Sequence, residues 1–147
     1  MAIQFEQLGP GDGARLTAEM QRWPLLAGMG RAALLREADR ILGDAGQWQA
    51  WLIRRGERVV GYLMLEFRAG ALFEAPRAHV AALYVEPASR SGELARAALR
   101  FASEVARWLH VRFDAGEAAR LDQHAAPLLG AGRPAPRWLH AQTQVVA

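Results

Sequence analysis

Hydrophobic and polar positions recur along the first third of the chain with two different periods, which predict a strand and two helices. Apolar residues alternate over residues 3–8, as in a short strand, and Asp12 follows at a position suited to capping a helix. Residues 14–23 and 31–42 then carry apolar side chains at helical spacing, with proline and glycine residues between them. The predicted order is strand, helix, helix.

Two strand-like runs follow, at residues 48–54 and 59–67, on either side of Arg55-Gly56-Glu57. Such a short, glycine-containing break between two runs indicates a β-hairpin. The second run is apolar on both faces, which favours a central place in a sheet. After a loop at residues 68–77, a further buried strand is predicted over residues 79–85.

The clearest helix is predicted over residues 91–110, because its hydrophobic residues fall on one face and its arginines on the other. We expect the apolar face to pack against the sheet and the polar face to meet solvent. The apolar face contains Leu94, Ala98, Phe101, Val105, Trp108 and Leu109, and the polar face contains Arg96, Arg100, Ser103 and Arg107.

The remaining pattern predicts a short strand at residues 111–113, a helix at 117–129 and a strand at 138–146. With no internal repeat and no long linker, we expect residues 1–147 to form a single domain. The order of elements predicts an α/β fold, in which a central sheet carries helices on its faces.

The amino-acid composition excludes several kinds of catalytic and metal site, and it says less about the fold. The 147 residues are 52% hydrophobic and 22% charged, a globular balance. Cysteine is absent, which excludes disulfides, thiolate metal sites and a cysteine nucleophile. All 18 basic residues are arginine, so a lysine Schiff base is also excluded. The four histidines lack metal-ligand spacing, so we expect no metal site, and we expect most of the five tryptophans in the core.

Charge and hydropathy bear on partners and location. The net charge of +3 permits an anionic partner, but Glu93 and Glu104 interrupt the arginine face of the long helix. That face is better explained as solvated than as a nucleic-acid surface. The longest apolar runs are far shorter than the ~20 residues of a membrane-spanning helix, and no secretory pattern is present. We therefore expect a cytoplasmic protein without a membrane segment.

Candidate chemistry gathers where the buried strand at residues 79–85 runs through a Ser-, Gly- and Arg-rich turn into the long helix. Unpaired N–H groups and the helix dipole make such a helix start a favourable site for phosphate. Arg90 and Arg96 flank it. The alternative is an ordinary strand–turn–helix corner, capped by Ser89 or Ser91.

The same stretch carries a family resemblance. The strand ends in Leu83-Tyr84-Val85-Glu86-Pro87, and Arg90 and Ala95 match the first and last positions of an Arg-x-x-Gly-x-Ala motif. With the order of elements, and Gly61 early in the second hairpin strand, residues 3–111 resemble the GNAT superfamily of acyl-CoA N-acyltransferases. The resemblance implies a mixed, mostly antiparallel sheet flanked by helices on both faces.

The resemblance also implies a function, which is transfer of an acyl group from acetyl-CoA directly to an amine on a small molecule or a protein. In that site the backbone of Leu83 and Val85 pairs with pantetheine, and the amides from Ser91 to Arg96 hold the pyrophosphate. The implied cofactor set is Leu83, Val85, Arg90, Ser91, Gly92, Glu93, Leu94, Ala95 and Arg96.

Two departures from the family pattern leave a second hypothesis open. Glu93 stands where the motif has its central glycine, and the position of the family's tyrosine acid falls on Asp122. We expect residues 91–95 to form the first helical turn, with Glu93 in solvent near Arg90 or Arg96. The alternative hypothesis is a catalytically inactive GNAT-fold module, serving as a homodimer or as a subunit of a larger assembly.

A base for the acceptor amine is not assigned by the resemblance. Glu66, Glu74 and His79 lie on or near the strand ends where an acceptor would enter, and they are the candidates. The competing interpretation of each is a solvated polar group at a strand end. Glu86, in Val-Glu-Pro, is expected to be a surface carboxylate.

Overall fold

Four antiparallel strands form the centre of the molecule, in the same order in space as along the chain. The computed structural model describes residues 2–22, 28–70, 72, 74–86, 92–115 and 144–146. The antiparallel strands are β1 (Ile3–Leu8), β2 (Trp48–Arg55), β3 (Arg58–Arg68) and β4 (Arg77–Val85). Two short strands, β5 (Arg112–Asp114) and β6 (Gln144–Val146), pair in parallel with β4. The mixed, mostly antiparallel sheet agrees with the prediction.

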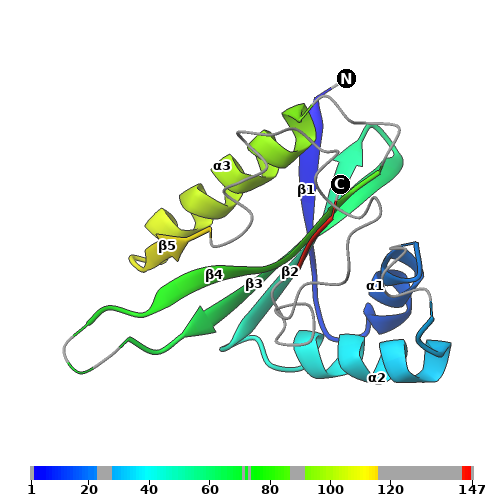
Figure 1. Cartoon of the computed structure of the whole chain (residues 1–147), viewed down its shortest axis with the longest axis horizontal. Coiled ribbons are helices and arrows are strands. Elements are labelled where there is room, and N and C mark those ends of the chain that lie inside the picture. The colour runs from blue at the N-terminus through cyan, green and yellow to red at the C-terminus, as the bar shows by residue number, and fades with distance from the viewer. Residues whose placement is uncertain are drawn as a thin grey trace.

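Helices cover both faces of this sheet (Figure 1). α1 (Gly13–Met20) and α2 (Arg31–Leu42) lie on one face, and α3 (Glu93–Trp108) lies on the other. Each face therefore has its own hydrophobic core. The core under α1 and α2 includes Leu16, Leu34, Tyr62 and Tyr84, and the core under α3 includes Leu63, Leu83, Leu94 and Val105. In the part of the chain that the structure describes, no helix is long and apolar enough to cross a membrane.

The pairing of β3 with β4 depends on Gly61 and on an extra residue in β4. A Cβ on Gly61 would lie 2.1 Å from the carbonyl oxygen of Tyr84, so only glycine allows this approach. Farther along, Met64 pairs with Ala82 and Leu65 with Val80, which leaves Ala81 as a bulge. Bulges re-aim a strand and are common beside functional sites.

The predicted strands and helices are largely confirmed, with small shifts at their ends. The hairpin, the central place of β3 and the short strand after α3 all appear, and the structure shows that this strand pairs in parallel with β4. Asp12 stands at the N-cap of α1 as predicted, but its carboxylate accepts the Gly9 N–H at 2.9 Å and makes no capping hydrogen bond to the helix backbone. The helix predicted at 117–129 and the first part of the strand predicted at 138–146 lie outside the described residues.

The orientation of α3 differs from the prediction at its far end. Trp108 is 87% exposed and Leu109 is 46% exposed, although both were expected on the buried face. The reason is a stripe of alanines at 95, 98, 102 and 106, which are all buried. These small side chains let the helix approach the sheet closely and turn the Trp108 side toward solvent.

Candidate functional site

At the end of β4, every second residue directs its peptide groups away from β3. The Glu86 N–H donates to the Val60 carbonyl of β3 at 2.9 Å. Because the peptide groups of successive strand residues point to opposite edges, those of Val85 and Leu83 face the other way. We call this side of β4 its outer edge. It is the edge at which the sequence resemblance places pantetheine.

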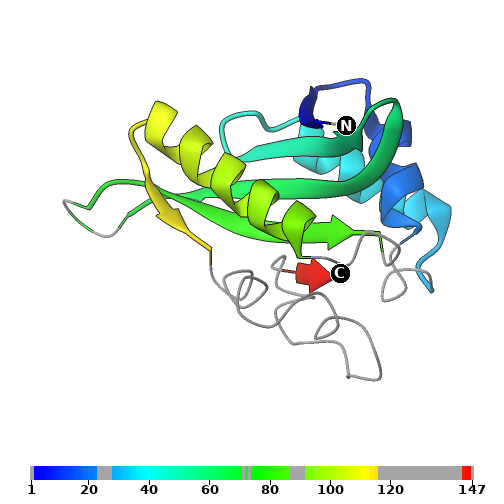
Figure 2. The same ribbon diagram turned by 90° about the horizontal axis from the view of Figure 1, so that it is seen from above.

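Two different strands share the outer edge of β4. β5 pairs with residues 77–79, and β6 pairs with residues 82–84, where Val145 lies opposite Leu83. Figure 2 shows β6 beside the end of β4. Between these two pairings lies the bulge at Ala81. A ligand that hydrogen-bonds to Leu83 on this edge would therefore take the place of β6.

The start of α3 differs from the predicted first turn. The helix begins at Glu93, and Gly92 caps it with a left-handed φ of 76°, a conformation that favours glycine. The family resemblance places the Arg96 amide among the phosphate donors. In the structure its N–H donates to the Gly92 carbonyl at 3.0 Å, as part of the helix. The amides of Glu93, Leu94 and Ala95 precede this first intrahelical hydrogen bond, at the helix start where a ligand can approach. Arg90 and Ser91 lie outside the described residues.

As predicted, Glu93 points into solvent, and 59% of its side chain is exposed. One partner was not foreseen: Oε2 of Glu93 lies 3.4 Å from Nη2 of Arg55, at the end of β2. The guanidinium of Arg96 lies over the helix cap, since a Cβ on Gly92 would meet its Nη1 at 3.0 Å. The helix start therefore combines three amides and a cation with a carboxylate that is turned outward.

Glu86 is buried, which contradicts its predicted place on the surface. Only 5% of the residue is exposed, and its carboxylate binds the guanidinium groups of Arg22 and Arg58. The reason is alternation: Glu86 is two residues beyond Tyr84 and shares its face, which packs toward α1. Two arginines from distant parts of the chain compensate its charge, and no local sequence pattern shows that pairing.

Next to Glu86 on the same face, the two tyrosines of the chain lie opposite each other on β3 and β4. Their ring centroids are 5.6 Å apart. Burial raises the pKa of Tyr62 well above its ordinary value and also raises the pKa of Tyr84. Both phenols therefore stay protonated at neutral pH.

At the other end of β4, the structure brings two of the three base candidates together. Glu66 and His79 are directly opposite each other on β3 and β4, and they are 4% and 8% exposed. The sequence missed a neighbour: Asp114 of β5 pairs in register with His79, and its Oδ2 lies 3.5 Å from Nδ1 of the imidazole. Glu74 stands apart on an exposed loop, 3.5 Å from Arg77.

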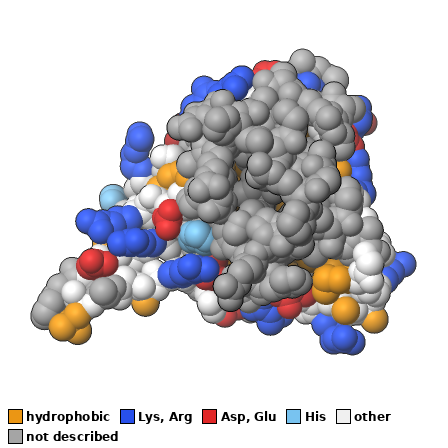
Figure 3. Space-filling view, in the orientation of Figure 1, with side chains coloured by type: hydrophobic (Ala, Val, Ile, Leu, Met, Phe, Trp, Pro, Cys, Tyr) orange, Lys and Arg blue, Asp and Glu red, His pale blue; other side chains and the backbone are white. Residues whose placement is uncertain are grey.

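The surface around this end of the sheet carries positive and negative side chains that lie close together. Figure 3 shows arginine and acidic side chains next to one another over β5 and the ends of β3 and β4. Arg68 binds Glu66, and Arg77 lies beside Glu74. Among the described residues, no group of three or more histidine or acidic side chains is arranged to hold a metal ion.

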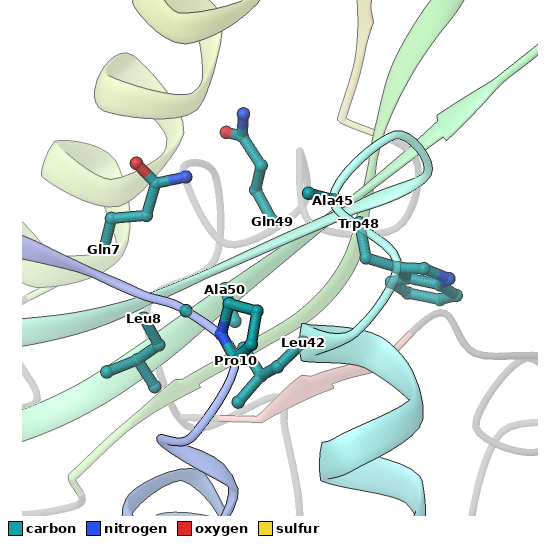
Figure 4. Close-up of a pocket in the computed structure, with 9 residues that line it drawn as sticks. Gln7, Leu8, Pro10, Leu42, Ala45, Trp48, Gln49 and Ala50 are labelled. Atoms are coloured by element: carbon teal, nitrogen blue, oxygen red, sulfur yellow. The ribbon is translucent and has the colours of Figure 1, made fainter.

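A separate cavity of about 340 Å³ lies between the end of β1, the end of α2 and the start of β2. Figure 4 shows the Gln7 and Gln49 side chains on one side of the strands and Leu8, Pro10 and Leu42 on the other. None of the residues that the sequence assigned to a site lines this cavity.

Comparison with known proteins identifies the fold. The family model described as acetyltransferase (GNAT) family matches residues 17–126, which is most of the chain. The chain belongs to the GNAT family. No curated protein matches it.

Solved structures agree with the family assignment. The GNAT chain is similar to an integron cassette protein from the mobile metagenome of Cole Harbour Salt Marsh, with 25% identity over 90% of this chain and 88% of that one, and a TM-score of 0.66. It is also similar to AAC(6')-Iy in complex with a CoA bisubstrate analogue, with 15% identity, 84% and 86% coverage and a TM-score of 0.64. A predicted acetyltransferase from Clostridium acetobutylicum, solved with acetyl-CoA, has 14% identity, 94% coverage of both chains and a TM-score of 0.63.

Proposed function

We propose that this GNAT protein transfers an acetyl group from acetyl-CoA to an amine. The observation that carries the proposal is the outer edge of β4, which leads from the bulge at Ala81 toward the first-turn amides of α3. Family membership supports it, as do the CoA analogue in AAC(6')-Iy and the acetyl-CoA in the Clostridium protein. An acyl-CoA thioester is intracellular, so we also propose a cytoplasmic location.

In this proposal the donor lies along β4 with its phosphates at α3. The first-turn amides of Glu93, Leu94 and Ala95 and the guanidinium of Arg96 suit a pyrophosphate. Arg90, Ser91 and Gly92 precede the helix in the sequence and complete the phosphate set that the family resemblance implies, while the backbone of Leu83 and Val85 binds the pantetheine amides. The carboxylate of Glu93 does not oppose the phosphates directly, because it is exposed and faces Arg55.

In this proposal the transfer is direct, as the family resemblance implies, and the chain has no cysteine to form a covalent thioester intermediate. The protein's part is to hold the amine against the thioester carbonyl and to exclude water. We propose a small-molecule amine as acceptor, since AAC(6')-Iy is solved with an acetylneamine conjugate, and a protein amine as the alternative.

Calorimetric titration of CoA and acetyl-CoA into the purified protein tests the donor site. Replacing Arg96 by Gln should weaken CoA binding about tenfold, the effect of losing one charged contact to phosphate. Arg100→Gln is the matched control, because Arg100 is exposed one turn farther along α3. No heat at millimolar CoA would rule out the proposal.

A second candidate is the catalytically inactive module, which one observation favours. β6 already pairs with β4 at Leu83, where pantetheine would bind. If β6 stays paired with β4 at all times, acetyl-CoA cannot bind at Leu83. The protein would then serve a structural or protein-binding role. Turnover of acetyl-CoA with any amine by the parent protein would exclude this candidate.

A further inference from the structure

Four residues from four neighbouring strands form one row across the sheet. Trp48 of β2 is opposite Glu66 of β3, Glu66 is opposite His79 of β4, and His79 is opposite Asp114 of β5. Directly opposite residues extend their side chains on the same face. That face is the one under α2, because Trp48 packs in the α1 and α2 core and Arg40 of α2 lies 5.3 Å from its ring.

Within this row, the Asp114 carboxylate lies beside the His79 imidazole as an ion-pair contact and not as a hydrogen bond to Nδ1. Nδ1 of His79 lies 3.5 Å from Oδ2 of Asp114. A carboxylate beside Nδ1 favours the tautomer with its proton on that nitrogen, which leaves the lone pair on Nε2. Such contacts are often long without substrate and tighten when it binds.

The pair also lies where a reacting thioester would end, and this step rests on the proposed function. A donor with its phosphates at α3 and its arm along Val85 and Leu83 runs down β4 toward Ala81. β5 ends at Asp114, beside His79, which is two residues before the bulge at Ala81. At about 3.3 Å per strand residue, Ala81 and His79 are only about 7 Å apart.

We propose that His79 is the general base of the transfer and that Asp114 is its positioning residue. Nε2 of His79 accepts a proton from the acceptor ammonium, and the freed amine forms a C–N bond to the thioester carbonyl carbon. The C–S bond then breaks, and the second proton of the amine passes to the departing sulfur. The products are an N-acetyl amine and the thiol of CoA, and His79 releases its proton to water.

The other candidates from the sequence suit this role less well. Glu66 is bound by Arg68 and lies near Arg40, so its carboxylate is already engaged by cations. Glu74 is exposed and pairs with Arg77 in the loop between β3 and β4. In the described part of the chain, the charged groups near His79 include Glu66 with Arg68 from β3, Asp114 from β5 and, through Glu66, Arg40 from α2.

The test follows CoA thiol release across pH with acetyl-CoA and three amine probes: an aminoglycoside, a polyamine and an alanine-terminated peptide. His79→Gln should lower kcat/KM about 10²-fold or more and abolish the fall in rate at acidic pH. Acetyl-CoA affinity, measured by calorimetry, should change less than twofold. Glu74→Gln, the matched control, should behave like the parent.

Asp114→Asn tests positioning and is a conservative change at a half-exposed site. It should lower kcat about tenfold and leave the KM for the amine unchanged, because the imidazole loses the carboxylate that orients it. An unchanged kcat, or a loss that appears only in KM, would overturn the role of Asp114. If His79→Gln loses its fold by circular dichroism, His79→Asn is measured instead.

The outcomes separate the two proposals. An active parent whose rate and pH profile survive the loss of His79 overturns the base assignment and leaves the acetyl transfer standing. A parent that binds no acetyl-CoA, or binds it and acetylates none of the probes, overturns His79 as a base together with the transfer from which it was inferred.

Discussion

Glu93 and Arg55 meet at 3.4 Å between the first turn of α3 and the end of β2. The contact ties a carboxylate that stands in the glycine position of the family motif to a cation outside the motif. It directs the negative charge away from the amides of the helix start. The charge remains close, however, because Glu93 is the first residue of α3.

Glu93→Gln should therefore strengthen CoA binding. The substitution removes a negative charge next to the proposed phosphate site and keeps the size of the side chain. We expect a gain of about three- to fivefold, equal to roughly 1 kcal/mol for one exposed charge, and a smaller gain in high salt. Calorimetric titration at two salt concentrations measures it. Glu104→Gln, an exposed change far along the same helix, should have no effect.

Deleting residues 144–147 should also strengthen CoA binding, because it frees the outer edge of β4 at Leu83. Backbone hydrogen bonds contribute about 0.5–1.5 kcal/mol each, so release of this short pairing corresponds to roughly tenfold in affinity. A variant lacking only Ala147 is the control. Equal affinities for both proteins would show that β6 does not compete for this edge.

Loss of both arginines at Glu86 should destabilise the fold more than the two single losses together. Arg22→Ala or Arg58→Ala leaves the buried carboxylate with one cation, whereas the double variant leaves it with neither of the two. We expect a cost of about 3 kcal/mol for the double variant. Urea unfolding of the four proteins gives the coupling, and simple additivity would contradict the shared role.

Glu6 should make stability depend on pH in the acidic range. Hydrogen bonds from Arg15 and then Arg54 lower the pKa of Glu6 below its ordinary value. The stabilisation is therefore complete above the unfolded-state pKa and is lost as pH falls through the folded-state pKa. Because Glu6 is partly exposed, its contribution is at most about 1 kcal/mol.

Urea unfolding of the parent and of Glu6→Gln, from about pH 7 to about pH 3, tests this dependence. The difference in free energy between the two proteins should shrink as the solution becomes more acidic. A difference that stays constant over this range would assign it to packing instead of charge.

Much of the fold could be predicted because it depends on local patterns. The hairpin around Gly56 and the apolar run of β3 indicate their own structure within a few residues. Trp108 was misplaced because alanines count little in a hydrophobic pattern, yet they determine how closely a helix approaches a sheet.

The candidate site was harder to predict, because its residues meet only through strand pairing. Asp114 lies in a strand of three residues, too short for a periodic signal, and it reaches His79 only after β5 has docked on β4. Glu86 depends in the same way on Arg22 and Arg58. Sequence patterns indicate which residues could carry chemistry, and tertiary pairing determines which of them meet.

Among the residues that the structure describes, the sheet separates two cores with different buried side chains, one under α1 and α2 and the other under α3. Substitutions on opposite faces have few common neighbours, so their effects on stability should add. Because the sheet lies between the two cores, substitutions on one side leave the packing of the other side in place. The half that carries the His79 row can thus diversify over evolutionary time with little effect on the half beneath α3.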